Sequence, residues 1–417
     1  MPACGLDFGT SNSALGIVRD GMPVLAPVEG ENTLIPSAIF FDFENHGRVI
    51  YGREAVDAYI GQHDGRLMRA LKTVLGSSLM DEKTAVGRRR IALTEVIEFF
   101  IRHLKSKAEA FAGCEIDQVV HGRPVRFTEH NDAAEARAQT VLEDIAHRAG
   151  FTDVSFVYEP IAAAFHYEET VSHEELVLVA DIGGGTSDFT VIRVGPSRRA
   201  KVDRRDDILA NAGIRIGGTD FDRFLNVAAV MPLLGLGTQL ITKDLPMPGA
   251  TYFELATWAT INFVYTQKIE REVAQLVADS REPEKTVRLL HTLRKRLGHR
   301  IAFAVEDAKI ALSEETRTTI PLDFLERNLS AETSQTAFDR AIADKTRKLR
   351  DIATQCIADA GVRADQIHTI FLTGGSSRVP AVRHALSQAA PAAQMTSGSD
   401  LLSVAYGLTR EAERRFR

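Results

Sequence analysis

Short apolar runs alternate with longer amphipathic stretches over the first 200 residues of the chain. Residues 93–112 and 131–150 carry apolar positions at helical spacing, and Asn131 and Gly150 stand where an N-cap and a C-terminal glycine belong. The runs QVVHGRPV (118–125) and VSFVYEP (154–160) surround the second of these stretches and are typical of buried strands. Strands that alternate with helices predict an α/β protein.

Two segments of the chain share one plan. GLDFGTSNSALGIV (5–18) and VADIGGGTSDFTVIRV (179–194) each contain a strand ending in Asp, a glycine turn with Gly-Thr-Ser, and a second strand. A tight turn between two such runs predicts a β-hairpin. The repeat indicates two related halves.

The later part of the chain has a different pattern. It predicts a mainly helical region from about 220 to 312, a β-rich segment at 316–324, and a helix through the 330s to 350s. A final strand, loop and helix begin with HTIFLTGGSSRVPAVRHAL (368–386), in which a glycine turn leads to Pro380 at a helix start.

The glycine turns are candidates for binding phosphate. Glycines expose backbone N–H groups with no side chain in the way, and such amides suit phosphate oxygens. Asp181 and Asp188 would repel a bare phosphate, but they can hold a hydrated Mg²⁺ that bridges to one. A single GGGT is more often a plain turn, and the second copy at residues 7–12 shifts the interpretation toward a metal and nucleotide site.

Composition narrows the class of protein. The 417 residues predict two lobes or domains, and a net charge of −6 argues against a nucleic-acid binder that works through a large basic face. Three isolated cysteines form no zinc or disulfide pattern. No signal peptide is recognisable, and the most apolar stretch, 224–237, is too short and too broken to cross a bilayer. We expect a cytoplasmic protein without membrane contact.

The ordered motifs then reveal a family. Together the chain resembles, from end to end, the ATPase domain of the DnaK-type heat-shock chaperones of about 70 kDa, including the short bacterial YegD-like proteins. The motifs that carry this resemblance are GLDFGTSNS, VYEPIAAAFHY, VADIGGGTSDFTV, GIRIGGTDFD, AVEDAKIALS, FLTGGSSRVP and SDLLSVAYG. The family belongs to the superfamily that also contains actin and the sugar kinases.

The resemblance implies a two-lobed, actin-like ATPase fold. Each lobe would be built on an RNase H-like mixed sheet with flanking helices, with the nucleotide in the cleft between the lobes. Lobe I would comprise residues 1–171, with a C-terminal helix at 401–417 packing back on it. Lobe II would comprise 172–400, including a helical subdomain at about 220–315.

The resemblance also implies roles for individual residues, with ATP or ADP and Mg²⁺ as cofactors. The expected catalytic residues are Lys72, Glu159, Asp181 and Thr186. The expected metal residues, acting mostly through water, are Asp7, Asp181 and Asp188. The expected nucleotide-binding residues are Gly9, Thr10, Ser11, Gly183, Gly184, Gly185, Gly217, Gly218, Glu306, Lys309, Ser313, Gly374, Gly375, Ser376, Arg378 and Asp400.

Such residues suit phosphoanhydride hydrolysis, because that reaction depends on positioning and charge neutralisation rather than on a covalent nucleophile. Outside the family context, Lys72 would be an ordinary surface lysine, Glu159 a strand-end acid, and Glu306 with Lys309 a surface ion pair.

The chain departs from the family pattern at two places. Ile310 stands where the chaperones carry an arginine that stacks on adenine, so we expect weaker nucleotide affinity or looser base selectivity. The 417 residues end in a basic helical pattern where the longer chaperones continue into a linker and a peptide-binding domain, so we expect no peptide-binding domain.

Three functions follow as hypotheses. The first is an ATP-binding, slowly hydrolysing, chaperone-like monomer that engages an unidentified client or co-chaperone and no nucleic acid. The second is a small-molecule kinase of the sugar-kinase type, and the third is a nucleotide-dependent, actin-like scaffold. A nucleotide sensor without turnover also stays open.

Overall fold

The computed structural model describes residues 3–45, 47–87, 89–128, 131–199, 201, 204–242, 244–398 and 402–416. By their contacts the residues divide into two compact units. Unit 1 comprises Met1–Gly217, Arg347–Ser377 and Val382–Arg417, and unit 2 comprises Gly218–Thr346 and Arg378–Ala381. The two lobes divided at 171/172 are a different partition of the chain, and they stay a prediction.

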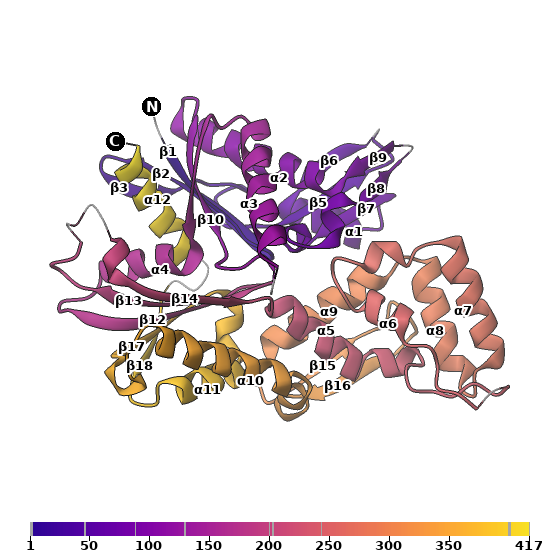
Figure 1. Cartoon of the computed structure of the whole chain (residues 1–417). Helices are drawn as coiled ribbons and strands as arrows, with labels where there is room; N and C mark the ends of the chain where they lie inside the picture. Colours follow the sequence, from indigo (N-terminus) through magenta and orange to yellow (C-terminus); the bar gives the residue numbers. More distant parts are fainter. Residues whose placement is uncertain are drawn as a thin grey trace. The chain divides into compact units, whose positions relative to one another are not determined.

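Unit 1 contains two mixed sheets of the same topology (Figure 1). The first has the order β11-β10-β1-β2-β3, from β1 (Ala3–Phe8), β2 (Asn12–Arg19), β3 (Met22–Leu25), β10 (Gln118–Arg123) and β11 (Asp153–Tyr158), with β4 (Ile35–Pro36) added to β2. Its first three strands are antiparallel, and β1, β10 and β11 are parallel. β10 and β11 confirm the two strands predicted around the second amphipathic stretch.

The second sheet repeats this arrangement strand for strand. Its order is β14-β13-β12-β17-β18, from β12 (Glu175–Ile182), β13 (Ser187–Val194), β14 (Ile208–Ile214), β17 (Thr369–Thr373) and β18 (Gln394–Ser397). Again three antiparallel strands are followed by parallel neighbours on the other side of the first strand. The repeat in the sequence is therefore a repeat in topology, as the two hairpin motifs predict.

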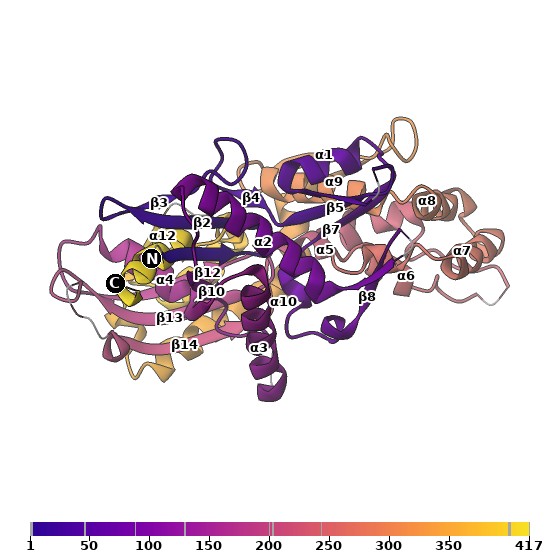
Figure 2. The same cartoon turned by 90° about the horizontal axis from the view of Figure 1, so that it is seen from above.

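Two helices join the sheets through one continuous core. Figure 2 shows α12 (Ser403–Arg415) along the first sheet, where it packs on β1, β2 and β10, while α4 (Glu159–Glu168) packs on β12 and β13. The helices also contact each other. Val120, Val177 and Leu408 belong to the same buried cluster, which draws side chains from both sheets and both helices. Burial of this apolar surface stabilises unit 1 as a whole.

The two predicted ends of the helix at 131–150 are confirmed. α3 (Asp132–Ala149) begins after Asn131, whose Oδ1 accepts the N–H of Ala134 at 3.0 Å, and it ends at Gly150 with a φ of 107°. α2 (Leu93–Ala112) packs beside it. The remaining elements of this part are α1 (Gly52–Ile60), β5 (Ala38–Asp42), β6 (Arg48–Tyr51), β7 (Gly65–Arg69), β8 (Lys83–Val86), β9 (Arg89–Ala92), and the short 3₁₀ helices η1 (Leu71–Val74) and η2 (Ser78–Asp81).

Unit 2 is mainly helical, as predicted. Its elements are α5 (Gly218–Ala229), α6 (Ala250–Leu255), α7 (Gln267–Asp279), α8 (Pro283–Arg294), α9 (Gly298–Ala311) and the hairpin of β15 (Arg317–Pro321) and β16 (Ser330–Ser334). The long helix α10 (Gln335–Asp359) contains the boundary between the units, and α11 (Pro380–Ala389) begins at the proline that marks its start in the sequence. No helix among the described residues is long and apolar enough to span a bilayer.

Candidate functional site

The two predicted hairpin turns touch each other within unit 1. In each hairpin four residues separate the last paired positions, Phe8 with Ser13 and Ile182 with Ser187. A Cβ placed on Gly184 would lie 3.1 Å from the Cβ of Thr10, which is closer than side chains normally approach. The same glycine therefore permits the close approach of the second turn to the first.

Three predicted metal residues lie beside these turns. Asp181 and Asp188 are cross-strand partners in β12 and β13, and both are almost fully buried, with 6% and 1% of their surface exposed. Asp188 Oδ1 accepts the N–H of Val125 at 2.7 Å, whereas its Oδ2 has no hydrogen-bond partner among the described residues. Asp7 occupies the matching position in β1, and its cross-strand partner is Ala14.

Lys72 and Glu159 form a buried ion pair at the same place. Lys72 comes from η1 and Glu159 from the first residue of α4, so the pair joins positions 87 residues apart in the chain. Their side chains are only 5% and 9% exposed. Because a buried lysine is rarely retained without a partner, the ordinary surface role that Lys72 would have outside the family does not apply here.

Burial and the neighbouring charges shift the pKa values of these residues. Burial raises the pKa of Asp7 and of Asp181 well above the usual value, and the negative charge of Glu159 raises both further. Burial and Glu159 also raise the pKa of Asp188 to about 7. For Lys72, burial lowers the pKa, but Glu159 and Asp7 outweigh it, so the pKa is raised and the ammonium stays charged. Three buried acids and the half-buried Asp7 thus lie around one lysine, an arrangement that favours a bound cation.

Magnesium suits this cluster through water. Carboxylate oxygens are the ligands that Mg²⁺ prefers, and it usually retains several waters. The unpartnered Oδ2 of Asp188 is a buried acceptor that such a hydrated ion would satisfy. Among the described residues, no group of three or more His, Cys, Asp or Glu is arranged to ligate a metal directly. That a metal is held here mainly through its waters stays a prediction.

The third glycine turn packs on the second hairpin. Gly374 follows β17 with a φ of 78°, and a Cβ there would lie 2.8 Å from Asp181 Oδ1, so both its backbone and its surroundings require glycine. Ser376 Oγ donates a hydrogen bond of 3.0 Å to the carbonyl of Gly183. Gly217 approaches the same turn, because its Cβ would lie 2.6 Å from the carbonyl carbon of Gly184. All three glycine motifs of the sequence therefore converge.

A family model described as Hsp70 protein matches residues 3–230 and 271–410. The chain belongs to the Hsp70 family. Membership confirms the resemblance drawn from the motifs and the α/β fold of the actin-like ATPase class, and it supports ATP binding and chaperone-type activity. The family model does not match residues 231–270, which belong to unit 2 and include α6.

A second group of predicted residues of this Hsp70-family chain lies in unit 2. Lys309 of α9 forms an ion pair of 2.6 Å with buried Asp222 and lies 3.4 Å from the carbonyl oxygen of Gly218. Burial raises the pKa of Asp222, while Lys309 lowers it. The Lys309 ammonium is thus engaged within unit 2. Ser313 Oγ donates to the Lys309 carbonyl at 3.3 Å.

The remaining predicted residues fall in different places. Glu306 lies on α9, and Arg378 belongs to unit 2. Ile310, at the position of the family's adenine-stacking arginine, is 59% exposed. Asp400 lies outside the described residues. Thr186 accepts the N–H of Gly183 at 2.9 Å through its carbonyl, and its side chain lowers the pKa of Asp188 through a hydrogen bond.

Two residues beside the candidate site were missed from the sequence. Ser37 Oγ donates to the carbonyl of Gly9 at 2.7 Å and contacts Ser13 Oγ at 2.8 Å, so it fixes the first turn. His121 is fully buried, and burial, together with the charge of Lys72, lowers its pKa to about 4. Neither stands in a recognisable motif, and only the tertiary structure identifies them.

Proposed function

We propose that this Hsp70-family chain binds ATP with Mg²⁺ and hydrolyses it slowly to ADP and phosphate. The observation that carries the proposal is the buried Lys72–Glu159 pair, which lies within a cluster of three further acids beside two glycine turns in contact. A structural ion pair needs neither the extra acids nor the glycines. Family membership supports the same function.

Each group in the cluster has a part in phosphoryl transfer. The turns at 9–11 and 183–185 would bind phosphate oxygens through backbone N–H groups, and Thr186 would contact the γ-phosphate. Lys72 would neutralise charge that develops on the transferred group. Glu159 or Asp181 would orient the attacking water and accept its proton. Burial raises the pKa of Asp181, which suits a general base near neutral pH.

Magnesium would supply charge neutralisation between the β- and γ-phosphates, held through water by Asp7, Asp181 and Asp188. Its positive charge would restore ionisation of carboxyl groups whose pKa is raised in the metal-free protein. We therefore expect binding of Mg-nucleotide near pH 6.5 to release protons.

For the nucleoside, we propose contacts from Glu306, Lys309, Ser313 and Arg378, and from the turn at Gly374, Gly375 and Ser376. Asp400 stays a proposal on the family pattern alone. Ile310 can pack on a base through its exposed aliphatic side chain, but it lacks the cation-stacking contribution of an arginine, which is about 0.5–2 kcal/mol. Modest affinity for adenosine follows.

Single-turnover hydrolysis of Mg-ATP by the wild type, Asp181→Asn and Glu159→Gln tests the proposal. We expect both variants to slow hydrolysis by about 100-fold or more, because each removes a carboxylate from the proposed reaction centre. Asp365→Asn, an exposed carboxylate that the proposal does not use, should match the wild type. Equal rates in all four proteins would exclude the mechanism, and absence of nucleotide binding by calorimetry would exclude the function.

Finer statements stay predictions. The cytoplasmic location, the monomeric state and the client or co-chaperone rest on the sequence pattern. A sugar and polyol screen for substrate-stimulated ADP release and light scattering with nucleotide would test the kinase and scaffold hypotheses.

A further inference from the structure

A cavity of about 990 Å³ lies in unit 1, lined by none of the predicted catalytic or metal residues. Its walls come from β10 and β11, from α3, α4 and α12, from described residues between β13 and β14, and from the start of β14. This volume is at the upper end of the range typical of small-molecule sites.

Positive charge dominates the lining. Among the described residues, the lining contains seven cationic side chains and one carboxylate, that of Glu411. Arg414 and Arg415 both form ion pairs with Glu411, at 3.1 and 2.8 Å. Three carboxylates that are not among the lining residues also pair with lining cations: Glu135 with Arg123, Glu168 with Arg204, and Asp207 with Arg204 and Lys201. The protein as a whole carries −6, so this concentration of positive charge is local.

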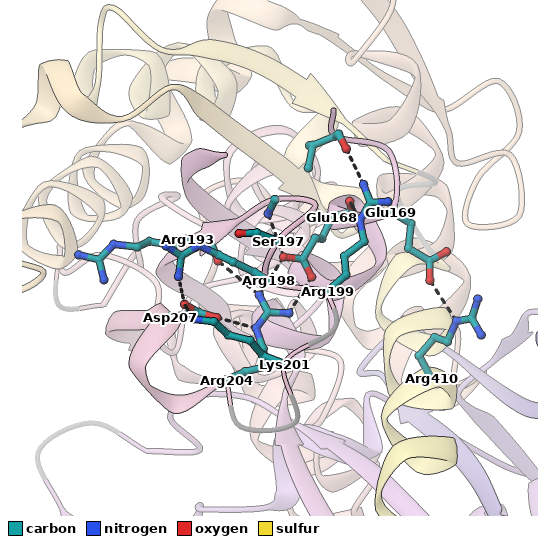
Figure 3. A network of polar contacts seen from close by, with 12 residues as sticks. Glu168, Glu169, Arg193, Ser197, Arg198, Arg199, Lys201, Arg204, Asp207 and Arg410 are labelled. Atoms are coloured by element: carbon teal, nitrogen blue, oxygen red, sulfur yellow. Dashed lines mark hydrogen bonds and ion pairs between the residues drawn. The ribbon is translucent and has the colours of Figure 1, made fainter. Parts of the chain in front are cut away.

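The guanidinium groups are held in place before any ligand arrives. Figure 3 shows Arg204 between Glu168 and Asp207. Its guanidinium donates two hydrogen bonds to Glu168, at 2.7 and 2.8 Å, and one to Asp207 at 2.7 Å. Arg199 donates to the carbonyl of Glu168 at 2.9 Å and to that of Val171, so it caps the end of α4. Side chains fixed in this way lose little conformational entropy when an anion binds.

Aromatic rings lie among these cations. The Arg204 guanidinium lies 5.1 Å from the centre of the Phe165 ring, that of Arg414 lies 5.9 Å from the same ring, and that of Arg123 lies 5.2 Å from the Tyr158 ring. Ile161 and Ile208 add aliphatic surface to the lining. Planar cations and rings together suit a flat, unsaturated group that carries negative charge.

We propose that this cavity binds a small phosphorylated molecule with a planar ring, of the nucleotide class, without a metal ion. Arginine recognises phosphate through paired N–H donors, and the rings and isoleucines provide a surface for the base. This site differs in kind from the carboxylate cluster, where negative charge makes phosphate binding depend on Mg²⁺. Binding in the presence of a chelator therefore distinguishes the two sites.

The probe is adenosine 3′,5′-bisphosphate, titrated calorimetrically into the full chain in EDTA. We expect one site per chain and weaker binding as salt rises, because exposed charges such as Lys201 are screened. The double variant Lys201→Ala/Arg205→Ala should bind at least 10-fold more weakly. The control Lys268→Ala/Arg363→Ala removes the same charge from exposed positions outside the lining and should bind like the wild type.

Several outcomes would overturn the proposal: no binding in EDTA, or equal affinity in the two double variants. Inorganic tripolyphosphate that binds as tightly as the bisphosphate would refute the role of the rings. A Glu-rich peptide that binds where the bisphosphate does not would assign the cavity to a protein partner instead. Circular dichroism and Mg-ATP binding of the Lys201→Ala/Arg205→Ala variant show whether it is folded, and keep this proposal separate from the ATPase proposal.

Discussion

The hairpin β1–β2 and the hairpin β12–β13 have the same register and turn length, yet one matched position carries an apolar residue in the first and an acid in the second. Opposite Asp7 stands Ala14, whereas opposite Asp181 stands Asp188. Ala14 is buried against Leu25 and Ala405, so the first hairpin uses this position to dock α12. Asp188 instead accepts the N–H of Val125 and keeps an unpartnered oxygen. The same backbone position thus holds a packing residue, Ala14, in the first hairpin and a buried acid, Asp188, in the second.

The two copies of the duplicated fold therefore supply unequal shares of the proposed chemistry: the first hairpin supplies Asp7, and the second supplies Asp181 and Asp188. Both hairpins need their strands and their glycine turn, but only the second carries two acids at adjacent positions. Such buried acids destabilise a metal-free protein, and natural proteins tolerate that cost mainly at functional sites.

The largest effect is expected from copying the acid into the first hairpin. Ala14→Asp would bury an unpaired carboxylate in the apolar contact with α12. It should lower the free energy of unfolding by about 3 kcal/mol or more. Urea denaturation followed by circular dichroism measures this. Ala14→Asn, of the same size but without charge, should cost clearly less. An Ala14→Asp protein as stable as the wild type would show that the two positions are interchangeable.

Removing the charge from the second hairpin should act on catalysis instead. Asp188→Asn keeps an acceptor for the Val125 N–H but loses the charge proposed to hold hydrated Mg²⁺, so single-turnover hydrolysis should fall about 100-fold, or about 2.7 kcal/mol. Asp57→Asn, an exposed change on α1, should leave the rate unchanged. Unaltered hydrolysis in Asp188→Asn would remove this residue from the proposed metal site.

The contact between the turns can be tested with neighbouring glycines. Gly184→Ala would force a methyl group to 3.1 Å from the Cβ of Thr10, whereas the nearest atom to a Cβ on Gly183 is the Thr186 oxygen at 3.4 Å. We expect Gly184→Ala to destabilise by about 1–3 kcal/mol and to weaken Mg-ATP binding, and Gly183→Ala to do much less of both. Thermal unfolding and calorimetry compare the pair, and equal effects would contradict the close approach.

A further difference between the hairpins concerns pH. The pKa of Asp188 is about 7 in the folded protein and near 3.8 when unfolded, so between these values the folded state holds a proton that the unfolded state has lost. The stability of the metal-free protein should therefore fall as pH rises from about 4 to 7. Urea midpoints in EDTA measure this slope, which should be shallower in Asp188→Asn. A slope unaffected by that substitution would place the proton elsewhere.

Local patterns predicted much of the fold. The two hairpins, the caps of α3 and the helical character of unit 2 could all be predicted from the sequence. Turns, caps and amphipathic helices depend on residues close together in the chain. The glycines and aspartates of the candidate site were legible for the same reason. Lys72 and Glu159 were each identified only through the family resemblance, and their pairing was not predicted, since nothing local in either segment links positions 87 residues apart.

By itself, the sequence determined the duplicated strand-turn-strand plan, the acids at the strand ends and the family. Only the tertiary structure decided that Ser37 fixes the first turn, that Ala14 docks α12 while Asp188 stays a buried acid, and that cations from β10, α12 and the 195–207 segment surround one cavity. The physical reason is range: turn and strand preferences act over a few residues, whereas burial and charge depend on what distant segments bring together.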